Sequence, residues 1–419
     1  MTIIQTISLI IILIIVVLGF YKRNDFFSPG RLFSLVWAVS IFVTEFKYSG
    51  FQKEWSSYSW FVLILGLISF LLGTFISYVL HISKHADSIK VLRKSIQSND
   101  IVDFDKLYLT IKVLFLCYTI SFIVEVIQFG TIPILSAFPD KARVDFGMFG
   151  FHLFIGIVSS IMFLCVEYLV LKSKNRKHKL LVIAILLITF ASYFLLLQKF
   201  NYILLFVLIL VFCYYGSHLL TFKKLLIAFV AFGGFIIFLQ SIRLSRYANE
   251  FFYVISKMKY SRDYAMFTGP YMYVTMNLEN FARGVDVMSR HSYGLMTADW
   301  LAALTGIKHW AIEYFGVDYR KYVTTTYNTY PFLWDYYYDF GLMGVFIFPL
   351  ITGIWISSIY YKMRITKKIK WVVIYSFFGF VILFSFFYNN LTSLNMTTNL
   401  FVLWLIHSIF IVPKVKAVA

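Results

Sequence analysis

Eleven runs of apolar residues, each close to the length that crosses a lipid bilayer, recur along this chain of 419 residues. A transmembrane helix needs about 20 consecutive apolar residues, because each residue rises about 1.5 Å through a hydrocarbon core about 30 Å thick. The runs cover residues 3–20, 32–45, 58–80, 108–127, 149–171, 180–197, 201–216, 225–240, 335–360, 371–388 and 398–412. We therefore predict an all-α polytopic membrane protein with about 11 transmembrane helices (10–12), forming a single integral membrane domain over residues 1–419.

The composition supports this class of protein. Hydrophobic residues make up 60% of the chain and charged residues only 14%, whereas a soluble domain carries about 25% charged residues. The lipid bilayer is therefore the first partner to expect. The formal net charge of +18 belongs to the membrane topology, and we expect no nucleic-acid partner.

Basic residues cluster in short loops on one side of the predicted spans, at Lys84–Lys106, Lys172–Lys179 and Tyr361–Lys370. Because short loops rich in lysine and arginine stay in the cytoplasm, we predict an external N-terminus and a cytoplasmic C-terminus. Residues 241–331 then form one large external loop with short helices, and residues 128–148 a shorter external loop. The cytoplasmic loops carry no GxGxxG or Walker A motif and are too short to hold a nucleotide-binding domain, so we expect an activated substrate to arrive from the membrane or the periplasm.

The 241–331 loop holds ten lysines and arginines. Positive charge held outside the cytoplasm implies an anionic partner, and lipid phosphates are the nearest candidates. Arg243 and Arg246 share a helix face if the preceding span continues, and two guanidinium groups suit a pyrophosphate. The alternative is a pair of arginines that reach from a helix end to the aqueous surface. Further cations along the loop are Arg262, Arg283 and Arg290.

Two groups in this loop are candidates for proton transfer. As a neutral imidazole, His291 is able to accept a hydroxyl proton; alternatively it makes only structural hydrogen bonds. Near the end of the loop, Asn328 or Thr329 can cap a helix whose first turn contains Pro331.

In that helix, Asp335 and Asp339 fall on one face at the outer edge of the membrane. Each carboxylate is either favoured by the helix dipole or retained for a function, since charge at this level is unfavourable. The aromatic residues around them either populate the membrane interface or stack on sugar rings. In the shorter loop, Arg143 either binds a phosphate or pairs with Asp140 or Asp145.

Three segments resemble the Wzy-type oligosaccharide repeat unit polymerases of bacterial surface polysaccharides, which make O-antigen and capsule. They are FGTIPIL with the following Arg143, the HSYG of the basic loop, and the closing NTYPFLWDYYYDFGLMG. The match covers about 120 residues, 128–146 and 241–345. One departure is Gln198-Lys199, where members often carry Gly-Arg between the sixth and seventh spans.

The resemblance implies a GT-C-like, inverting glycosyltransferase of the bacterial inner membrane that uses no metal and no cofactor. The donor would be a glycan on undecaprenyl pyrophosphate, the acceptor a new lipid-linked repeat unit, and a chain-length regulator in the membrane a further partner. The catalytic base would be Asp339 or His291, which the sequence does not separate. Pyrophosphate binding would fall to Arg143, Arg243, Arg246, Arg262 and Arg283, and sugar binding to Tyr293, Asn328, Thr329, Asp335 and Tyr336.

Three other functions share parts of this pattern. An O-antigen ligase uses the same donor but transfers the glycan to a lipid A core. A flippase or exporter of lipid-linked oligosaccharides usually has two similar halves, which this sequence lacks. A membrane acyltransferase needs a histidine-centred site, and the sequence gives His152 and His407 no obvious partners.

Overall fold

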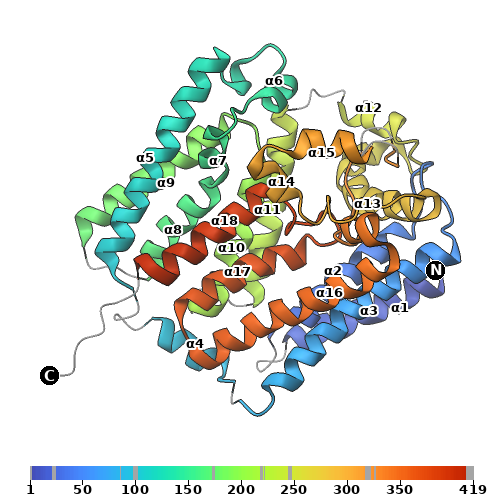
Figure 1. Cartoon of the computed structure of the whole chain (residues 1–419), viewed down its shortest axis with the longest axis horizontal. Helices are drawn as coiled ribbons and strands as arrows, with labels where there is room; N and C mark the ends of the chain where they lie inside the picture. The colour runs from blue at the N-terminus through green and yellow to red at the C-terminus, as the bar shows by residue number, and fades with distance from the viewer. Residues whose placement is uncertain are drawn as a thin grey trace. The chain divides into compact units, whose positions relative to one another are not determined.

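The computed structural model describes residues 2–20, 25–84, 86–97, 102–171, 175–217, 220, 222–243, 248–316, 322–324 and 327–411. In this part of the chain every regular element is a helix, and β-structure is limited to two isolated bridges, Ser49 with Met258 and Thr324 with Tyr327 (Figure 1). The predicted all-α class is confirmed for these residues. The chain divides into two compact units, which are described separately.

Unit 1 combines three stretches of sequence: Met1–His85, Leu244–Tyr361 and Val381–Thr397. Its helices are α1 (Ile3–Phe20), α2 (Pro29–Thr44), α3 (Ser57–His81), α12 (Ala248–Ile255), the 3-10 helix η2 (Arg262–Phe267), α13 (Thr268–Val287), α14 (Asp299–Thr305), α15 (Lys308–Phe315) and most of α16 (Leu333–Thr366). The described part of the external loop predicted from the sequence therefore contributes five helices to this unit.

Unit 2 contains Ala86–Arg243, Lys362–Phe380 and Thr398–Ala419. Its helices are α4 (Ile89–Ile96), α5 (Phe104–Phe129), η1 (Pro133–Leu135), α6 (Pro139–Asp145), α7 (Phe151–Gly156), α8 (Val158–Val170), α9 (Arg176–Phe194), α10 (Phe200–Gly216), α11 (Phe222–Arg243), and most of α17 (Ile369–Leu383) and α18 (Leu394–Leu405), the last followed by a π-helical turn (Ile406–Phe410).

Each apolar run predicted from the sequence overlaps helical structure in the described residues, although run 149–171 is divided between α7 and α8 and run 371–388 extends past the end of α17 at Leu383. Among the described residues, five helical segments are long and apolar enough to cross a membrane alone: Ser57–His81, Phe104–Leu135, Phe151–Val170, Arg176–Phe194 and Leu333–Thr366. The other predicted spans match shorter apolar helices. Such an architecture fits a membrane-embedded protein, because a helix satisfies its own backbone hydrogen bonds in lipid.

The core of unit 1 depends on close contact between α3 and α16. A Cβ on Gly73 would lie 2.2 Å from the carbonyl oxygen of Leu350, and a Cβ on Gly353 would lie 2.3 Å from that of Phe70. Only glycine allows the two backbones to approach so closely, as small residues do at helix interfaces in membranes. This contact fixes the position of α16, whose first turns carry the candidate site.

The beginning of α16 differs from the prediction in one respect. The helix begins at Leu333, so Pro331 precedes it, although the N–H of Trp334 still donates to the carbonyl of Pro331 at 3.0 Å. Inside the helix, Gly341 has φ 59° and ψ −139°, a combination that is essentially restricted to glycine. The first eight residues of α16 are thus set off from the long apolar part by a kink.

Candidate functional site

Asp339 lies at this kink and holds the loop that follows α13. Its carboxylate accepts hydrogen bonds from the hydroxyl of Ser292, from the N–H of Met296 at 3.1 Å and from the N–H of Thr297 at 2.6 Å. The Asp339 side chain is fully buried. A carboxylate enclosed by three donors fixes a loop; it has little freedom to take a proton from a substrate.

His291, the other candidate base, stands at the surface of the same loop. Its Nδ1 lies 3.2 Å from the carbonyl oxygen of Tyr338. Because a carbonyl only accepts, Nδ1 carries the hydrogen, and in the neutral ring the lone pair is on Nε2. The side chain is exposed. His291 therefore has an oriented ring on an exposed side chain, with the lone pair on the nitrogen that lies nearer Gly341; an oriented, accessible imidazole is what general base catalysis requires.

Two glycine positions keep this histidine in place. A Cβ on Gly341 would lie 3.2 Å from both Nε2 and Cε1 of His291. On the other side, Tyr293 and Gly294 form a tight turn with φ of 50° and 112°. This turn leaves the Tyr293 ring 76% exposed, so it is free to stack on a ring of a ligand.

Tyrosines connect His291 to the beginning of α3. The His291 and Tyr337 rings meet edge to face with centroids 6.2 Å apart, and the hydroxyl oxygens of Tyr337 and Tyr58 are 3.5 Å apart. Beside them, Asp286 on α13 accepts from the hydroxyls of Ser56 at 2.5 Å and Ser59 at 2.8 Å. Asp286 and Tyr58 are exposed, so this wall offers hydroxyl and carboxylate groups next to the histidine.

A buried glutamate on α13 organises the neighbouring aromatic residues. Glu279 accepts from the N–H of Lys53 at 3.0 Å and from the indole N–H of Trp55 at 2.9 Å. The Trp55 and Trp60 rings lie 4.5 Å apart. Burial raises the pKa of Glu279, while its two hydrogen bonds and the nearby Arg283 and Lys47 oppose this shift.

The cations of unit 1 differ in their environments. Arg283, one turn after Glu279 on α13, is half-buried and forms no hydrogen bond or ion pair with a described residue, although Glu279 attracts it. Arg290 is exposed beside His291. Arg262 instead forms an ion pair with Glu250, which occupies its guanidinium group. Of the predicted pyrophosphate ligands in this unit, Arg283 is thus the best placed to bind an anion.

Asn328 and Thr329 are positioned by α13. The amide of Asn280 donates to the carbonyls of Tyr327 at 2.8 Å and Thr329 at 3.1 Å, and the hydroxyl of Thr329 donates to the side chain of Asn277. Thr329 is therefore part of a structural network, while the Asn328 side chain is exposed and free to meet a polar ligand.

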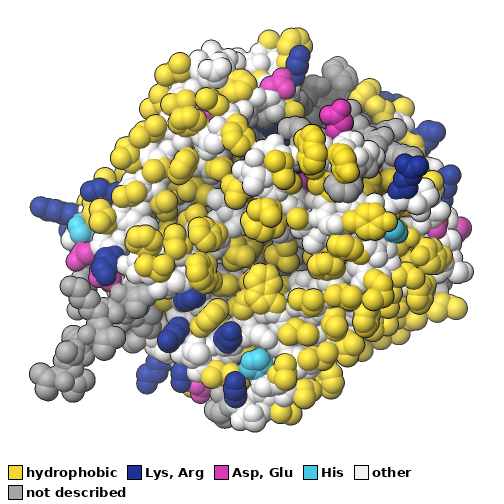
Figure 2. Space-filling view, in the orientation of Figure 1, with side chains coloured by type: hydrophobic (Ala, Val, Ile, Leu, Met, Phe, Trp, Pro, Cys, Tyr) yellow, Lys and Arg dark blue, Asp and Glu magenta, His cyan; other side chains and the backbone are white. Residues whose placement is uncertain are grey.

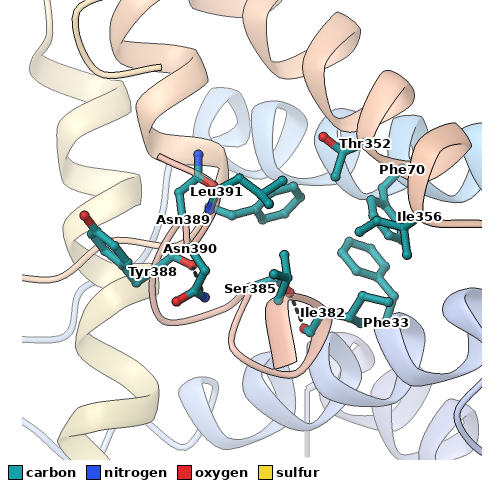
Figure 3. A pocket seen from close by; sticks show the side chains of 12 residues that line it. Phe33, Phe70, Thr352, Ile356, Ile382, Ser385, Tyr388, Asn389, Asn390 and Leu391 are labelled. Atoms are coloured by element: carbon teal, nitrogen blue, oxygen red, sulfur yellow. Dashed lines mark hydrogen bonds between the residues drawn. The ribbon is translucent and has the colours of Figure 1, made fainter. Parts of the chain in front are cut away.

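Asp335 and Tyr336 face the interior of unit 1. Asp335 accepts from the hydroxyl of Thr392 at 2.7 Å, and Tyr336 stacks on Phe348 with centroids 4.9 Å apart. A small cavity nearby has room for about one water molecule (Figure 3). Its lining is Phe33, Phe70, Phe332, Thr352, Ile356, Val381, Ile382, Ser385, Tyr388, Asn389, Asn390 and Leu391. No sugar fits there, so burial does not favour the predicted sugar contacts of Asp335 and Tyr336.

The remaining predicted ligands are elsewhere or are not described. Arg143 is half-buried on α6 of unit 2. Arg243 is the last residue of α11, but its side chain lies outside the described residues, as does the whole of Arg246. The shared helix face predicted for Arg243 and Arg246 is therefore left as a prediction.

Unit 2 contains two glutamate–histidine pairs that the sequence did not reveal. His152 Nδ1 lies 3.1 Å from Glu125, and His407 Nε2 lies 3.0 Å from Glu167, with both side chains of the second pair fully buried. Both histidines thus have partners, which sequence inspection missed because the members of each pair are 27 and 240 positions apart.

Among the described residues, no group of three or more histidine, cysteine, aspartate or glutamate side chains is placed to hold a metal ion. Comparison of the chain with protein-family models, with curated proteins and with solved structures finds no match. The functional proposal therefore rests on the geometry of unit 1 and on the sequence.

Proposed function

We propose that this chain is a membrane glycosyltransferase that joins polyprenyl-pyrophosphate-linked oligosaccharide repeat units into a surface polysaccharide. The observation that carries the proposal is the oriented, exposed imidazole of His291 at the outer end of α16. A base at the end of a long apolar helix is at the correct level to meet a sugar carried on a lipid.

The chemistry assigns a role to each accessible group. His291 Nε2 takes the proton from the acceptor hydroxyl, whose oxygen forms the new bond to the anomeric carbon of the donor. The bond from that carbon to the pyrophosphate oxygen breaks, and the leaving group departs as a lipid pyrophosphate. Arg283 and Arg290 stabilise the negative charge that develops on it. A single displacement of this kind inverts the anomeric centre.

Asp339 acts in this scheme as a positioning residue. It holds Ser292, Met296 and Thr297, and through that loop it keeps His291 at its carbonyl partner. The exposed rings of Tyr58 and Tyr293 and the Asn328 amide supply the surface on which sugars are held. Amphipathic rings beside polar groups suit carbohydrate, which offers both CH faces and hydroxyls.

The topology in this proposal is that predicted from the charges. About eleven helices cross the bacterial inner membrane in a GT-C-like arrangement, with the 241–331 segment outside. The donor and the acceptor are both undecaprenyl-pyrophosphate-linked, and a chain-length regulator is a further membrane partner.

The test is an assay with purified protein and lipid-linked repeat units. A ladder of glycans differing by whole repeats supports the proposal. Transfer to a lipid A core without elongation identifies a ligase instead, and movement of lipid-linked sugar across the bilayer without elongation identifies a flippase. In the assay, His291→Gln is the control for a reaction that depends on the proposed base.

A further inference from the structure

Helices α14 and α15 of unit 1 expose more apolar surface than a water-facing hairpin would. Exposed fractions are 46% for Leu301, 48% for Leu304, 52% for Ile307, 64% for Trp310 and 70% for Tyr314. Figure 2 has hydrophobic side chains at the surface over the place that α14 and α15 occupy in Figure 1. Several large apolar side chains exposed on one short element mark an interaction site.

The position of this hairpin relative to the predicted membrane boundary follows from its attachment to Asp339. The N–H of Thr297 is bound to Asp339 at 2.6 Å, and α14 begins two residues later, at Asp299. Two residues span at most about 7 Å. Asp339 lies at the kink where the long apolar part of α16 begins, so α14 starts at the boundary of the predicted membrane.

Neither helix is able to cross a bilayer. They contain 7 and 8 residues, which rise about 11 and 12 Å, against a hydrocarbon core of about 30 Å. A turn at Gly306, with φ 75°, separates them. An ion pair between Lys308 and Asp299 at 2.7 Å joins their first turns. The hairpin is therefore a compact element that stays on one side of the membrane.

The kinds of exposed residue point to lipid. Tryptophan and tyrosine concentrate at the membrane–water interface, because their rings are apolar and their N–H or O–H groups remain hydrated. Trp310 and Tyr314 stack with centroids 5.3 Å apart. On α16, Phe340 and Met343 are also exposed, at 37% and 63%, and a Cβ on Gly294 would lie 3.6 Å from the Phe340 ring. The apolar surface thus continues from the hairpin loop to the beginning of the apolar part of α16.

We propose that α14 and α15 form an interfacial hairpin that lies in the headgroup region of the leaflet at which α16 begins, with Leu304, Ile307 and Tyr314 in contact with lipid. The hairpin fixes the depth of His291, which precedes it in the same Asp339-anchored loop. Resting on the proposed function, this placement brings the base to the level of a pyrophosphate on a polyprenyl lipid, so the enzyme takes lipid-borne acceptors in preference to soluble ones.

The depth of the hairpin is measured with spin labels on the full chain in nanodiscs, after replacement of Cys117, Cys165 and Cys213 by serine. Labels are placed at Leu304 and Tyr314, and for comparison at the exposed Glu313, which neighbours Tyr314 on α15 and whose charge favours water over lipid. We expect the first two to relax with oxygen and not with a water-soluble nickel chelate, and the label at Glu313 to do the reverse. Nickel access at all three sites would overturn the proposal in favour of a hairpin in water. Exclusion of both reagents at Leu304 and Tyr314 would overturn it in favour of a protein partner.

The second measurement addresses the substrate. The double variant Leu304→Glu/Ile307→Glu should extend lipid-linked repeat units at least about tenfold more slowly than wild type, because added charge lifts the hairpin from lipid; Glu313→Gln should not. Equal rates in the wild type and the double variant would contradict the role in placing His291. Labels in lipid together with no polymerisation by wild type would leave the hairpin assignment standing and reject the proposed function.

Discussion

The carboxylate of Asp339 accepts a hydrogen bond from the backbone N–H of Thr297 at 2.6 Å, across a sequence separation of 42 residues. With the bonds from Ser292 and Met296, it closes the loop that carries His291 onto the first turns of α16. The most buried carboxylate of the candidate site is thus the group that organises it, and in the proposed function the exposed imidazole of His291 is the group that meets the substrate.

The first prediction separates these two roles. Asp339→Asn replaces an acceptor oxygen with an N–H₂ group that faces another donor, and each unsatisfied buried donor costs about 1–3 kcal/mol. We expect a lower melting temperature, faster hydrogen exchange in residues 290–298 and reduced polymerisation. Unchanged melting and exchange with no polymerisation would instead make Asp339 the catalytic base.

The second prediction concerns His291. Because the side chain is exposed and, among the described residues, its ring hydrogen-bonds to the Tyr338 carbonyl alone, His291→Gln should leave melting unchanged while turnover falls by about 10²- to 10⁴-fold. His81→Gln is the matched control, since His81 Nδ1 likewise bonds to a backbone carbonyl, that of Ser77 at 2.7 Å, but at the opposite end of α3. Equal turnover in the two variants would exclude His291 as the base.

The helices of this protein were predictable because apolar length alone specifies a span. Ser57–His81 and Leu333–Thr366 coincide with predicted runs since a bilayer accepts few other structures. The site was only partly predictable. In the sequence, HSYG and the closing NTYPFLWDYYYDFGLMG are separate segments. The hydrogen bond between Ser292 and Asp339 joins residues 47 positions apart, and no local sequence pattern predicts a contact over that separation.

The role of α13 was not predicted, although a signal for it existed. Met272 and Met276 recur at helical spacing and are fully buried, a periodicity that indicates a packed helix inside what was predicted as an external loop with short helices. No local pattern identifies Glu279 as a structural residue, because its partners Lys53 and Trp55 come from a distant segment. Tertiary contacts of this kind decide which polar residues are structural.

The third prediction compares two arginines. Arg283 is half-buried and has no hydrogen bond or ion pair with a described residue, whereas Arg262 is paired with Glu250 at the surface. Arg283→Gln should reduce polymerisation about a hundredfold, the typical loss when a charge-stabilising donor leaves a site. Arg262→Gln should change it little, since exposed pairs contribute about 0–1 kcal/mol. Similar activities in both variants would remove Arg283 from the anion site.

The fourth prediction uses the buried Glu279. Burial raises its pKa above the 4.5 of an exposed glutamate. At a pH between 4.5 and the raised pKa, the folded state therefore holds a proton that the unfolded state has lost. Stability should therefore fall as the pH rises from about 4.5 through the raised value. Glu279→Gln does not titrate, and its altered hydrogen bonds affect stability equally at every pH. Melting temperatures from about pH 4 to about pH 8 should show wild type losing stability relative to the variant. If the difference in melting temperature between wild type and Glu279→Gln stayed constant across that range, burial would not be the main influence on the pKa of Glu279.

The last prediction concerns the contact that holds α13 against the beginning of α16. A Cβ on Gly284 would lie 2.3 Å from ring atoms of Trp334. Trp334 has no room to withdraw, because it is 2% exposed and stacks on Tyr330 with centroids 4.5 Å apart. Gly284→Ala should therefore lower the free energy of unfolding by about 1–3 kcal/mol, the usual effect of overpacking.

The matched control is Gly233→Ala on α11, where a Cβ would meet nothing within 4 Å. That change should stabilise the protein by roughly 0.5–1 kcal/mol, because alanine favours a helix over glycine. Melting temperature measures both variants. Since α13 also carries Arg283 and Asp286, the Gly284 variant should be both less stable and slower in polymerisation, whereas the Gly233 variant should keep its stability and its activity. A Gly284 variant as stable and active as wild type would mean that Trp334 moves aside, and that the position of α13 on α16 does not control the site.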